Sequence, residues 1–375
     1  MAVDTNAAMP TRIFSAACRL AAFCSLLLAC SSSGTPSGGT DQAGSTASAN
    51  GGQSSAGTGG ATSIAGRASI AGTSSGGAGG SAGASGALGA FGGAGASGVG
   101  GGSAGAGTTT PSTGCGTPAS QALASYVKFS ETVPGVDAKW QARNYYVYLP
   151  TGYDPNRAYT TVFVGPGCGA TGDMGIPISQ ASGDNAIVVG LDPDPTAEGR
   201  PCFDSESYPD PEEPYFNETL KEVEAKYCVD KSHLFVEGFS SGSWLTNLIG
   251  CVDGDIIRGQ GNASGCMQGA HPTCKGPIAF MGAHDLGDPA NSYQCGVDNR
   301  DRIVKLNGCS NQTMPYDPGP NITVKPPVTV SCVQYVGCKP GYPVVWCTTT
   351  NLGHNDQVGT GLSTFGFWKF WTSLP

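Results

Sequence analysis

Four stretches of the chain match the pattern Gly-x-Ser-x-Gly, in which a serine held in a tight turn can act as a nucleophile. They centre on Ser74, Ser81, Ser103 and Ser240. Glycine makes up 59 of the 375 residues, so chance matches are expected and the pattern alone decides little. A nucleophilic serine also needs a base, a carboxylate that orients the base, and N–H groups that stabilise an oxyanion. The residues that surround each serine must therefore show which of the four could be a nucleophile.

Ser240 alone lies between a predicted strand and a predicted helix. Residues 233–238 form a short apolar run that is typical of a buried parallel strand, and residues 241–250 carry an apolar helical face that stops at Gly250. The flanking glycines leave room where strand and helix nearly touch. The helix directs its N-terminus at the serine, and the N–H of Ser241 is the expected oxyanion donor. The alternative is an ordinary strand–helix turn or a phosphate-binding turn.

The base must come from the four histidines of the chain. His354 lies in a loop directly after the apolar strand predicted at 342–349, where a parallel sheet presents the ends of its strands. His233 begins the strand that leads to Ser240 and is therefore at its far end, and His271 lies in a cysteine-rich loop. We therefore expect His354 to be the base.

Two aspartates are candidates for the acid that orients this base. The stretch 277–289 predicts an apolar strand followed by the carboxylates Asp285 and Asp288. Either of them could orient His354. The order serine, aspartate, histidine along the chain is that of α/β hydrolases.

The rest of the domain alternates predicted strands and helices. Strands are expected at 142–150, 159–165 and 185–191, where the residues alternate in polarity or are β-branched. A helix is expected at 217–228. This pattern predicts an α/β fold with a mostly parallel central sheet flanked by helices.

Composition divides the chain into three zones. Residues 1–30 form a signal segment whose apolar stretch, 20–29, is too short to span a membrane. The segment ends at Cys30 in the sequence LLAC, which resembles a bacterial lipobox. Residues 31–113 are nearly all Gly, Ala, Ser and Thr and predict a disordered tether. Residues 114–375 predict one globular domain. We expect an exported lipoprotein at the cell surface or outer membrane, and the alternative is a secreted protein.

The predicted tether also distinguishes Ser240 from the other matches. Ser74, Ser81 and Ser103 lie inside it. A serine in a disordered segment has neither a fixed base nor fixed N–H donors, so none of these three is expected to be a nucleophile.

Cysteine usage agrees with export. Of the 15 cysteines, three lie in residues 1–30 and the remaining even number lies in the domain, so up to six disulfides are expected in an oxidising compartment. The chain has no C-x-x-C pair and no histidine at ligand spacing from a cysteine pair, so a zinc site is not indicated. We expect no metal and no cofactor. The net charge is −9 without a basic cluster, which argues against nucleic acid as a partner.

Four stretches of the domain resemble a known group, the secreted esterase family that holds feruloyl esterases, acetylxylan esterases and polyhydroxybutyrate depolymerases. The resemblance covers most of 140–370 and looks closest to feruloyl esterases. It implies an α/β-hydrolase fold. The stretches that carry it are 144–172, 227–242, 296–310 (with LNGC) and 334–354 (with GYPVVWC and GH).

The resemblance implies a role for each candidate residue. Ser240 matches the nucleophile of the family and His354 matches its base. The acid of the family follows an H-x-x-x-D turn, and the sequence HDLGD matches it, which selects Asp288 over Asp285. Asp285 is then expected to be a solvated turn carboxylate, and His284 is the histidine of the turn.

The resemblance also implies an oxyanion loop at 166–169. The family usually has His-Gly-Cys-Gly there, whereas this chain has Pro166 in place of the histidine. The N–H of Cys168 would be the second oxyanion donor beside that of Ser241. The chain also has Ser243 where the family prefers a glycine after the elbow.

The resemblance also implies two disulfide pairings. Cys168–Cys202 would join the oxyanion loop to the stretch GRPCF, and Cys228–Cys251 would clamp the strand before the elbow to the helix after it.

Together the residues and the resemblance predict an extracytoplasmic serine carboxylic ester hydrolase that releases acyl groups from plant cell-wall polysaccharide. The nearest alternative is a polyhydroxybutyrate depolymerase, whose substrate is a polyester. An alternative of another class is a non-catalytic surface protein that binds carbohydrate or polymer. The membrane is expected as a partner only through the lipid anchor.

Overall fold

The computed structural model describes residues 109–174, 177–195, 199–204, 210–267, 273–354 and 357–375. Three predictions therefore lie outside the described residues: the signal segment with Cys30, nearly all of the predicted tether, and His271.

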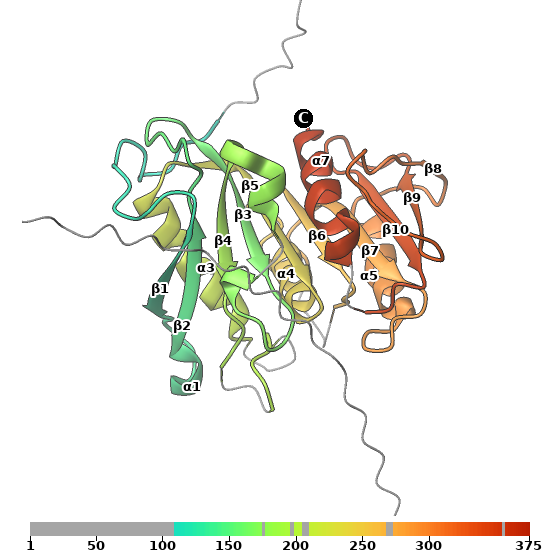
Figure 1. Ribbon diagram of the computed structural model, residues 1–375, viewed down its shortest axis with the longest axis horizontal. Helices are drawn as coiled ribbons and strands as arrows, with labels where there is room; N and C mark the ends of the chain where they lie inside the picture. The colour runs from blue at the N-terminus through green and yellow to red at the C-terminus, as the bar shows by residue number, and fades with distance from the viewer. Residues whose placement is uncertain (1–108, 175–176, 196–198, 205–209, 268–272, 355–356) are drawn as a thin grey trace, which may run out of the picture. The chain divides into compact units, whose positions relative to one another are not determined.

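The centre of the domain is one sheet, in which ten strands of the described residues follow the order β1-β2-β4-β3-β5-β6-β7-β10-β9-β8 (Figure 1). The strands from β4 to β10 in this order are parallel, and antiparallel strands extend both edges. The bounds are β1 Tyr126–Thr132, β2 Ala142–Tyr148, β3 Tyr159–Gly165, β4 Ala186–Leu191, β5 Val229–Phe239, β6 Gly259–Ala263, β7 Ala279–Asp285, β8 Thr313–Pro315, β9 Thr329–Tyr335 and β10 Val344–Thr350.

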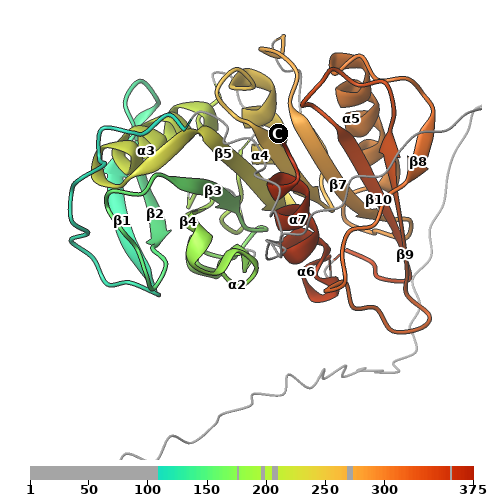
Figure 2. The ribbon, with the colours of Figure 1, turned by 90° about the horizontal axis from the view of Figure 1, so that it is seen from above.

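Helices cover both faces of this sheet. Figure 2 shows α3, α4 and α5 on one side and α2, α6 and α7 on the other. Among the described residues, no helix has the length and apolar character needed to cross a membrane. The bounds are α1 Ala138–Gln141, η1 Gly172–Met174, α2 Ile178–Ser182, η2 Gly183–Asn185, α3 Glu212–Lys226, α4 Ser241–Val252, α5 Tyr293–Leu306, α6 Gln357–Thr360, η3 Leu362–Gly366 and α7 Phe367–Thr372.

The central strands are apolar on both faces because both faces are covered. Every residue of β4 is buried, and so are all but one of β3. One half of the core packs under α3, α4 and α5, with Phe216, Leu245 and Ile303. The other half packs under α2 and α7, with Ile178 and Phe367. The predicted α/β-hydrolase fold, with a mostly parallel sheet flanked by helices, is confirmed.

Two helix boundaries differ from the prediction. Helix α3 begins at Glu212, before the expected start at 217, because the residues that follow Pro211 already face the core. Helix α4 continues through Gly250 to Val252. A Cβ on Gly250 would lie 1.6 Å from Oε1 of Gln260, so this glycine permits a close approach and does not end the helix.

The described residues contain six disulfides, and they confirm one predicted pairing and contradict the other. Cys168 pairs with Cys202 as expected. The expected pair of Cys228 with Cys251 is wrong. The bonds are Cys115–Cys228, Cys168–Cys202, Cys251–Cys274, Cys266–Cys295, Cys309–Cys338 and Cys332–Cys347.

Backbone hydrogen bonds explain why each of these two cysteines takes a different partner. Gly114 N donates to Glu224 O, which brings the segment with Cys115 beside Cys228. Lys275 N donates to Cys251 O, which brings Cys274 against Cys251.

The domain begins before the predicted boundary at 113/114. Thr110 N donates to Asp230 Oδ1 at 3.0 Å. Ser112 is buried, and its hydroxyl donates to Tyr227 O at 2.7 Å and accepts from Val229 N at 2.9 Å. Residues 110–113 are therefore part of the folded domain, although their Ser, Thr and Pro content resembles that of the preceding zone.

Candidate active site

The turn at Ser240 has the backbone geometry that a nucleophile elbow requires. Ser240 lies between β5 and α4 with φ 56° and ψ −116°, a conformation that side-chain-bearing residues rarely adopt. A Cβ on Gly242 would lie 1.7 Å from Gly165 O, and one on Gly238 would lie 2.1 Å from Gly242 O. Strand β3, strand β5 and helix α4 therefore meet so closely that glycine is needed on both sides of the serine.

Ser243 ties the elbow to β6. Its hydroxyl donates to Gly238 O at 2.6 Å and accepts from Ala263 N at 3.0 Å. Ser240 N in turn donates to Ala263 O at 3.0 Å. The serine that departs from the glycine preferred in the family is thus fully hydrogen-bonded within the fold.

His354 bridges Ser240 and Asp288. Its Nε2 lies 2.9 Å from Ser240 Oγ, and its Nδ1 lies 2.8 Å from Asp288 Oδ2 and 3.0 Å from Oδ1. A carboxylate only accepts, so Nδ1 carries the proton and Nε2 is free to accept the serine proton. The ring of Phe239 packs 5.1 Å from the imidazole ring and limits its movement.

The carboxylate of Asp288 is buried and surrounded by donors. Its side chain has no exposed surface. Oδ1 accepts the backbone N–H groups of Ala290 and Asn291, each at 2.9 Å. Nε2 of His284 lies 3.2 Å from Oδ2. These contacts hold the carboxylate in place beside His354.

Asp285 has a different role from the one expected. It is fully buried, so the prediction of a solvated turn carboxylate is wrong. Its Oδ2 accepts from Thr349 Oγ1 at 2.9 Å and from Leu352 N at 3.0 Å. Parallel pairing places Thr349 of β10 directly opposite Asp285 of β7, which encloses the carboxylate. Asp285 therefore fastens the loop that carries His354.

Neither of the other two described histidines contacts the nucleophile. Burial lowers the pKa of His284, which lies behind Asp288 and beside the rings of Tyr293 and Trp346. His233 Nδ1 bonds Asp230 Oδ2 at 2.8 Å near the start of β5. The structure places His354 alone of these three at the serine, in agreement with the chain-order argument.

The loop at 166–169 lies against the elbow. A Cβ on Gly167 would lie 3.4 Å from Ser240 Cβ, and Ser241 Oγ donates to Pro166 O at 3.5 Å. Gly169 N donates to Pro201 O, and among the described residues the N–H of Cys168 donates to no backbone carbonyl. Ser241 is the first residue of α4, so its N–H has no acceptor inside the helix. Neither of the two predicted oxyanion donors is therefore bonded to a backbone carbonyl of the described residues.

A buried ion pair supports the segment that carries Cys202, the disulfide partner of Cys168 in the loop at 166–169. Arg143 Nη2 lies 2.9 Å from Glu212 Oε2, and neither side chain is exposed. Glu212 Oε1 accepts from Asp204 N, and Arg143 donates to Asp192 O, so the pair fixes both ends of the segment with Cys202. This pair was not predicted from the sequence, although the alternation of β2 already places Arg143 on the buried face.

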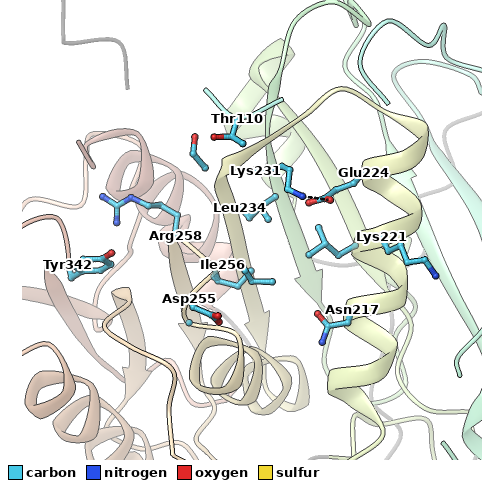
Figure 3. Close-up of a pocket in the computed structure, with 14 residues that line it drawn as sticks. Thr110, Asn217, Lys221, Glu224, Lys231, Leu234, Asp255, Ile256, Arg258 and Tyr342 are labelled. Atoms are coloured by element: carbon cyan, nitrogen blue, oxygen red, sulfur yellow. Dashed lines mark hydrogen bonds and ion pairs between the residues drawn. The ribbon is translucent and has the colours of Figure 1, made fainter. Parts of the chain in front are cut away.

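A separate cavity of about 490 Å³ lies toward the opposite end of the central strands. Figure 3 shows it between Leu234 of β5, Ile256 and Arg258, with the ion pair of Lys231 and Glu224 at its wall. Ser240 follows the other end of β5, so this cavity is not part of the catalytic arrangement. Among the described residues, no cluster of three His, Cys, Asp or Glu side chains could hold a metal.

Known proteins similar to this chain are esterases. Feruloyl esterase D of Neurospora crassa is 25% identical over 252 residues, which are 63% of this chain and 80% of that protein. Probable feruloyl esterase C of Aspergillus terreus is 26% identical over 242 residues, which are 61% of this chain and 84% of that protein. No protein-family model matches the chain.

Two solved structures are also similar. An acetyl xylan esterase from Aspergillus awamori has a TM-score of 0.48 at 15% identity, covering 64% of this chain and 99% of that one. A ferulic acid esterase from Anaeromyces mucronatus has a TM-score of 0.45 at 17% identity, covering 71% of this chain and 96% of that one.

Proposed function

We propose that this relative of the feruloyl esterases is a serine carboxylic ester hydrolase that releases feruloyl-type acyl groups from plant cell-wall polysaccharide. The observation that carries the proposal is the continuous hydrogen-bonded path from Ser240 through His354 to Asp288. The curated feruloyl esterases that the chain resembles over most of their length support the choice of substrate.

The geometry supports acyl transfer in two steps. Ser240 Oγ attacks the ester carbonyl while His354 Nε2 takes its proton, and Asp288 stabilises the resulting imidazolium. His354 then returns the proton to the leaving alcohol, and an acyl-enzyme remains. Water attacks this acyl-enzyme with His354 again as the base, which releases the acid and restores Ser240.

The negative oxygen of each tetrahedral intermediate would be held by two backbone N–H groups. Ser241 supplies one from the first turn of α4, where the helix dipole adds to the effect. Cys168 supplies the other from the loop that its disulfide with Cys202 anchors. Each such donor typically contributes about 3 kcal/mol to transition-state stabilisation.

Export is the second part of the proposal. All twelve domain cysteines pair within the described residues, which fits an oxidising compartment outside the cytoplasm. The sequence LLAC at Cys30 supports a lipid anchor at the cell surface. Labelled palmitate should enter the protein in a bacterial host, and Cys30→Ala should abolish that labelling. A soluble protein whose N-terminus is not residue 30 would contradict the anchor.

A substrate panel tests the function. Purified protein is incubated with methyl ferulate, acetylxylan and a polyhydroxybutyrate film, with Ser240→Ala as the blank and Ser310→Ala as a control serine away from the site. Release of ferulate by wild type and Ser310→Ala, and by neither Ser240→Ala nor buffer, supports the proposal. Turnover of the film alone would make the protein a polyester depolymerase. Binding of polysaccharide without turnover of any ester would make it a binding protein.

A further inference from the structure

Asn291 lies between the turn that carries the acid and the strand end that supports the nucleophile. It is nearly buried, and three of its polar groups are engaged. Its backbone N–H donates to Asp288 Oδ1 at 2.9 Å, its Nδ2 donates to Ser264 O at 2.8 Å, and its carbonyl lies 3.0 Å from His284 Nε2. One residue thus connects two segments that come from different strands.

The Ser264 end of this connection leads directly to the nucleophile. Ser264 follows β6 with φ 50°, and its N–H donates to Ala283 O of β7 at 2.9 Å. The preceding residue, Ala263, accepts from Ser240 N at 3.0 Å. The side-chain amide of Asn291 therefore fixes the acid turn to the same strand end that holds the backbone of Ser240.

The backbone carbonyl of Asn291 fixes the ring of His284, which lies beside the carboxylate of Asp288. A carbonyl only accepts, so the bond to Asn291 O requires the proton of His284 to be on Nε2. The same nitrogen lies 3.2 Å from Asp288 Oδ2. A Cβ on Gly296 would lie 2.3 Å from His284 Nδ1, so helix α5 packs too closely for the ring to turn.

We propose that Asn291 is a positioning residue, whose side-chain amide sets the distance between the carboxylate of Asp288 and the nucleophile Ser240. This inference rests on the proposed ester-hydrolase function. His354 can meet both partners at once only if they keep their present spacing, with 2.9 Å to the serine and 2.8 Å to the aspartate. The turn with Asp288 is otherwise held by hydrogen bonds of its own backbone, by His284, and by the disulfide Cys266–Cys295, which joins the segment after Ser264 to the first turn of α5.

Asn291→Ala tests the inference because it removes the side-chain amide and keeps the backbone N–H that bonds Asp288. We expect kcat for p-nitrophenyl acetate, per active site titrated with a fluorophosphonate, to fall by about 10- to 100-fold. KM should change little, since Asn291 is buried and its amide is engaged with Ser264 O.

The pH–rate profile supplies a readout that a merely structural residue would not change. Among the described residues, the titratable groups close to His354 and its partner are Asp288, His284 and Asp285, and Phe239 packs against the ring. A carboxylate that moves away stabilises the imidazolium less. The acid limb of kcat/KM should therefore move to lower pH in Asn291→Ala.

Asn307→Ala is the matched control. Asn307 is also buried, and its amide donates to Ile278 O at 2.7 Å and Tyr342 O at 2.9 Å, at the opposite end of the strands. This variant should lose thermal stability but keep wild-type kcat per titrated site and the wild-type pH profile. Asn291→Ala behaving in the same way would overturn the inference.

Two further variants keep the test decisive. Asn291→Asp preserves the shape of the side chain and removes its N–H donors, so it should show the same loss of kcat. It replaces Asn291→Ala as the test if that variant fails to fold. Wild-type turnover in Asn291→Asp would contradict the inference. Ser240→Ala separates the inference from the function. If Ser240→Ala retains wild-type turnover, the proposed function fails; if it is inactive while the Asn291 variants match wild type, only the positioning role fails.

Discussion

Nδ1 of His354 lies 2.8 Å from Oδ2 of Asp288, whereas the carboxylate of Asp285 accepts a hydrogen bond from Leu352 N, two residues before the histidine in the same loop. One aspartate orients the imidazole, and the other fastens the loop that brings it there. The two roles make different predictions for the two Asn variants.

Asp288→Asn should keep the fold and lose about 10⁴ in turnover if it resembles the triad aspartate of trypsin, because the histidine then has the wrong tautomer. Asp285→Asn should lower the melting temperature, since it weakens the buried bonds to Thr349 and Leu352, with a smaller loss of turnover in the folded protein. Steady-state kinetics and thermal melts of both variants check this. A crippled Asp285→Asn beside a mild Asp288→Asn would mean that the acid is assigned to the wrong residue.

The disulfide at the oxyanion loop should matter for catalysis as well as for stability. Replacing Cys168 and Cys202 together by serine frees the loop that supplies one oxyanion donor, and kcat should fall. The matched control replaces Cys309 and Cys338, which close a loop of similar length, 29 residues apart against 34, away from the site. Both doubles should lose a few kcal/mol of stability. Equal kcat in the two folded doubles would argue that the loop needs no anchor.

Glu237 should make the protein less stable as the pH rises. It is fully buried in β5, and among the described residues neither carboxylate oxygen has a hydrogen-bond partner. Burial raises its pKa well above the usual value of 4.5. Below that value the carboxyl is protonated in both the folded and the unfolded chain.

Above pH 4.5 the Glu237 carboxyl ionises in the unfolded chain, which stabilises the unfolded state. The free energy of unfolding of wild type therefore falls by about 1.4 kcal/mol per pH unit until the pKa of Glu237 in the folded protein is reached. Glu237→Gln cannot ionise, so its stability relative to wild type should increase from pH 5 to pH 8 in denaturant titrations. A difference that does not change with pH would show that Glu237 is charged in the folded protein.

The true start of the domain can be tested by truncation. A chain that begins at Gly114 loses the bonds of Thr110 and Ser112 to Asp230, Tyr227 and Val229. It should therefore melt at a lower temperature than a chain that begins at Thr109, with the same kcat, because these contacts lie at the start of β5 and the serine follows its end. Identical melting temperatures would restore the boundary to 113/114.

Some elements could be read from the sequence because one physical cause dominates them. The run 159–165 is β-branched and buried on both faces, and β3 has these bounds. Ser240, with glycine on both sides between an apolar run and an apolar helical face, could be placed for the same reason. The order of Ser240, an aspartate and His354 could be predicted because the order of the strands constrains it, whereas the choice of Asp288 over Asp285 came only from the family resemblance.

Other features depend on partners that are distant in sequence. Strand β6, with the sequence GQGNA, has no β-branched residue, and it is a strand because β5 and β7 pair with it on both sides. The burial of Asp285 follows from its pairing opposite Thr349, and the role of Asn291 follows from Ser264. No local pattern signals these contacts. The partners of Cys228 and Cys251 were mispredicted for the same reason.

Covalent labelling of the nucleophile tests the central claim most directly. The protein is reacted with a fluorophosphonate probe, residual hydrolysis of methyl ferulate is followed in the same samples, and the modified peptide is identified by mass spectrometry. The account predicts one adduct per chain on the peptide that contains Ser240, with activity lost in proportion to labelling, and no adduct in Ser240→Ala. Full hydrolysis after complete labelling of Ser240, or loss of activity with the adduct on another residue, would contradict it.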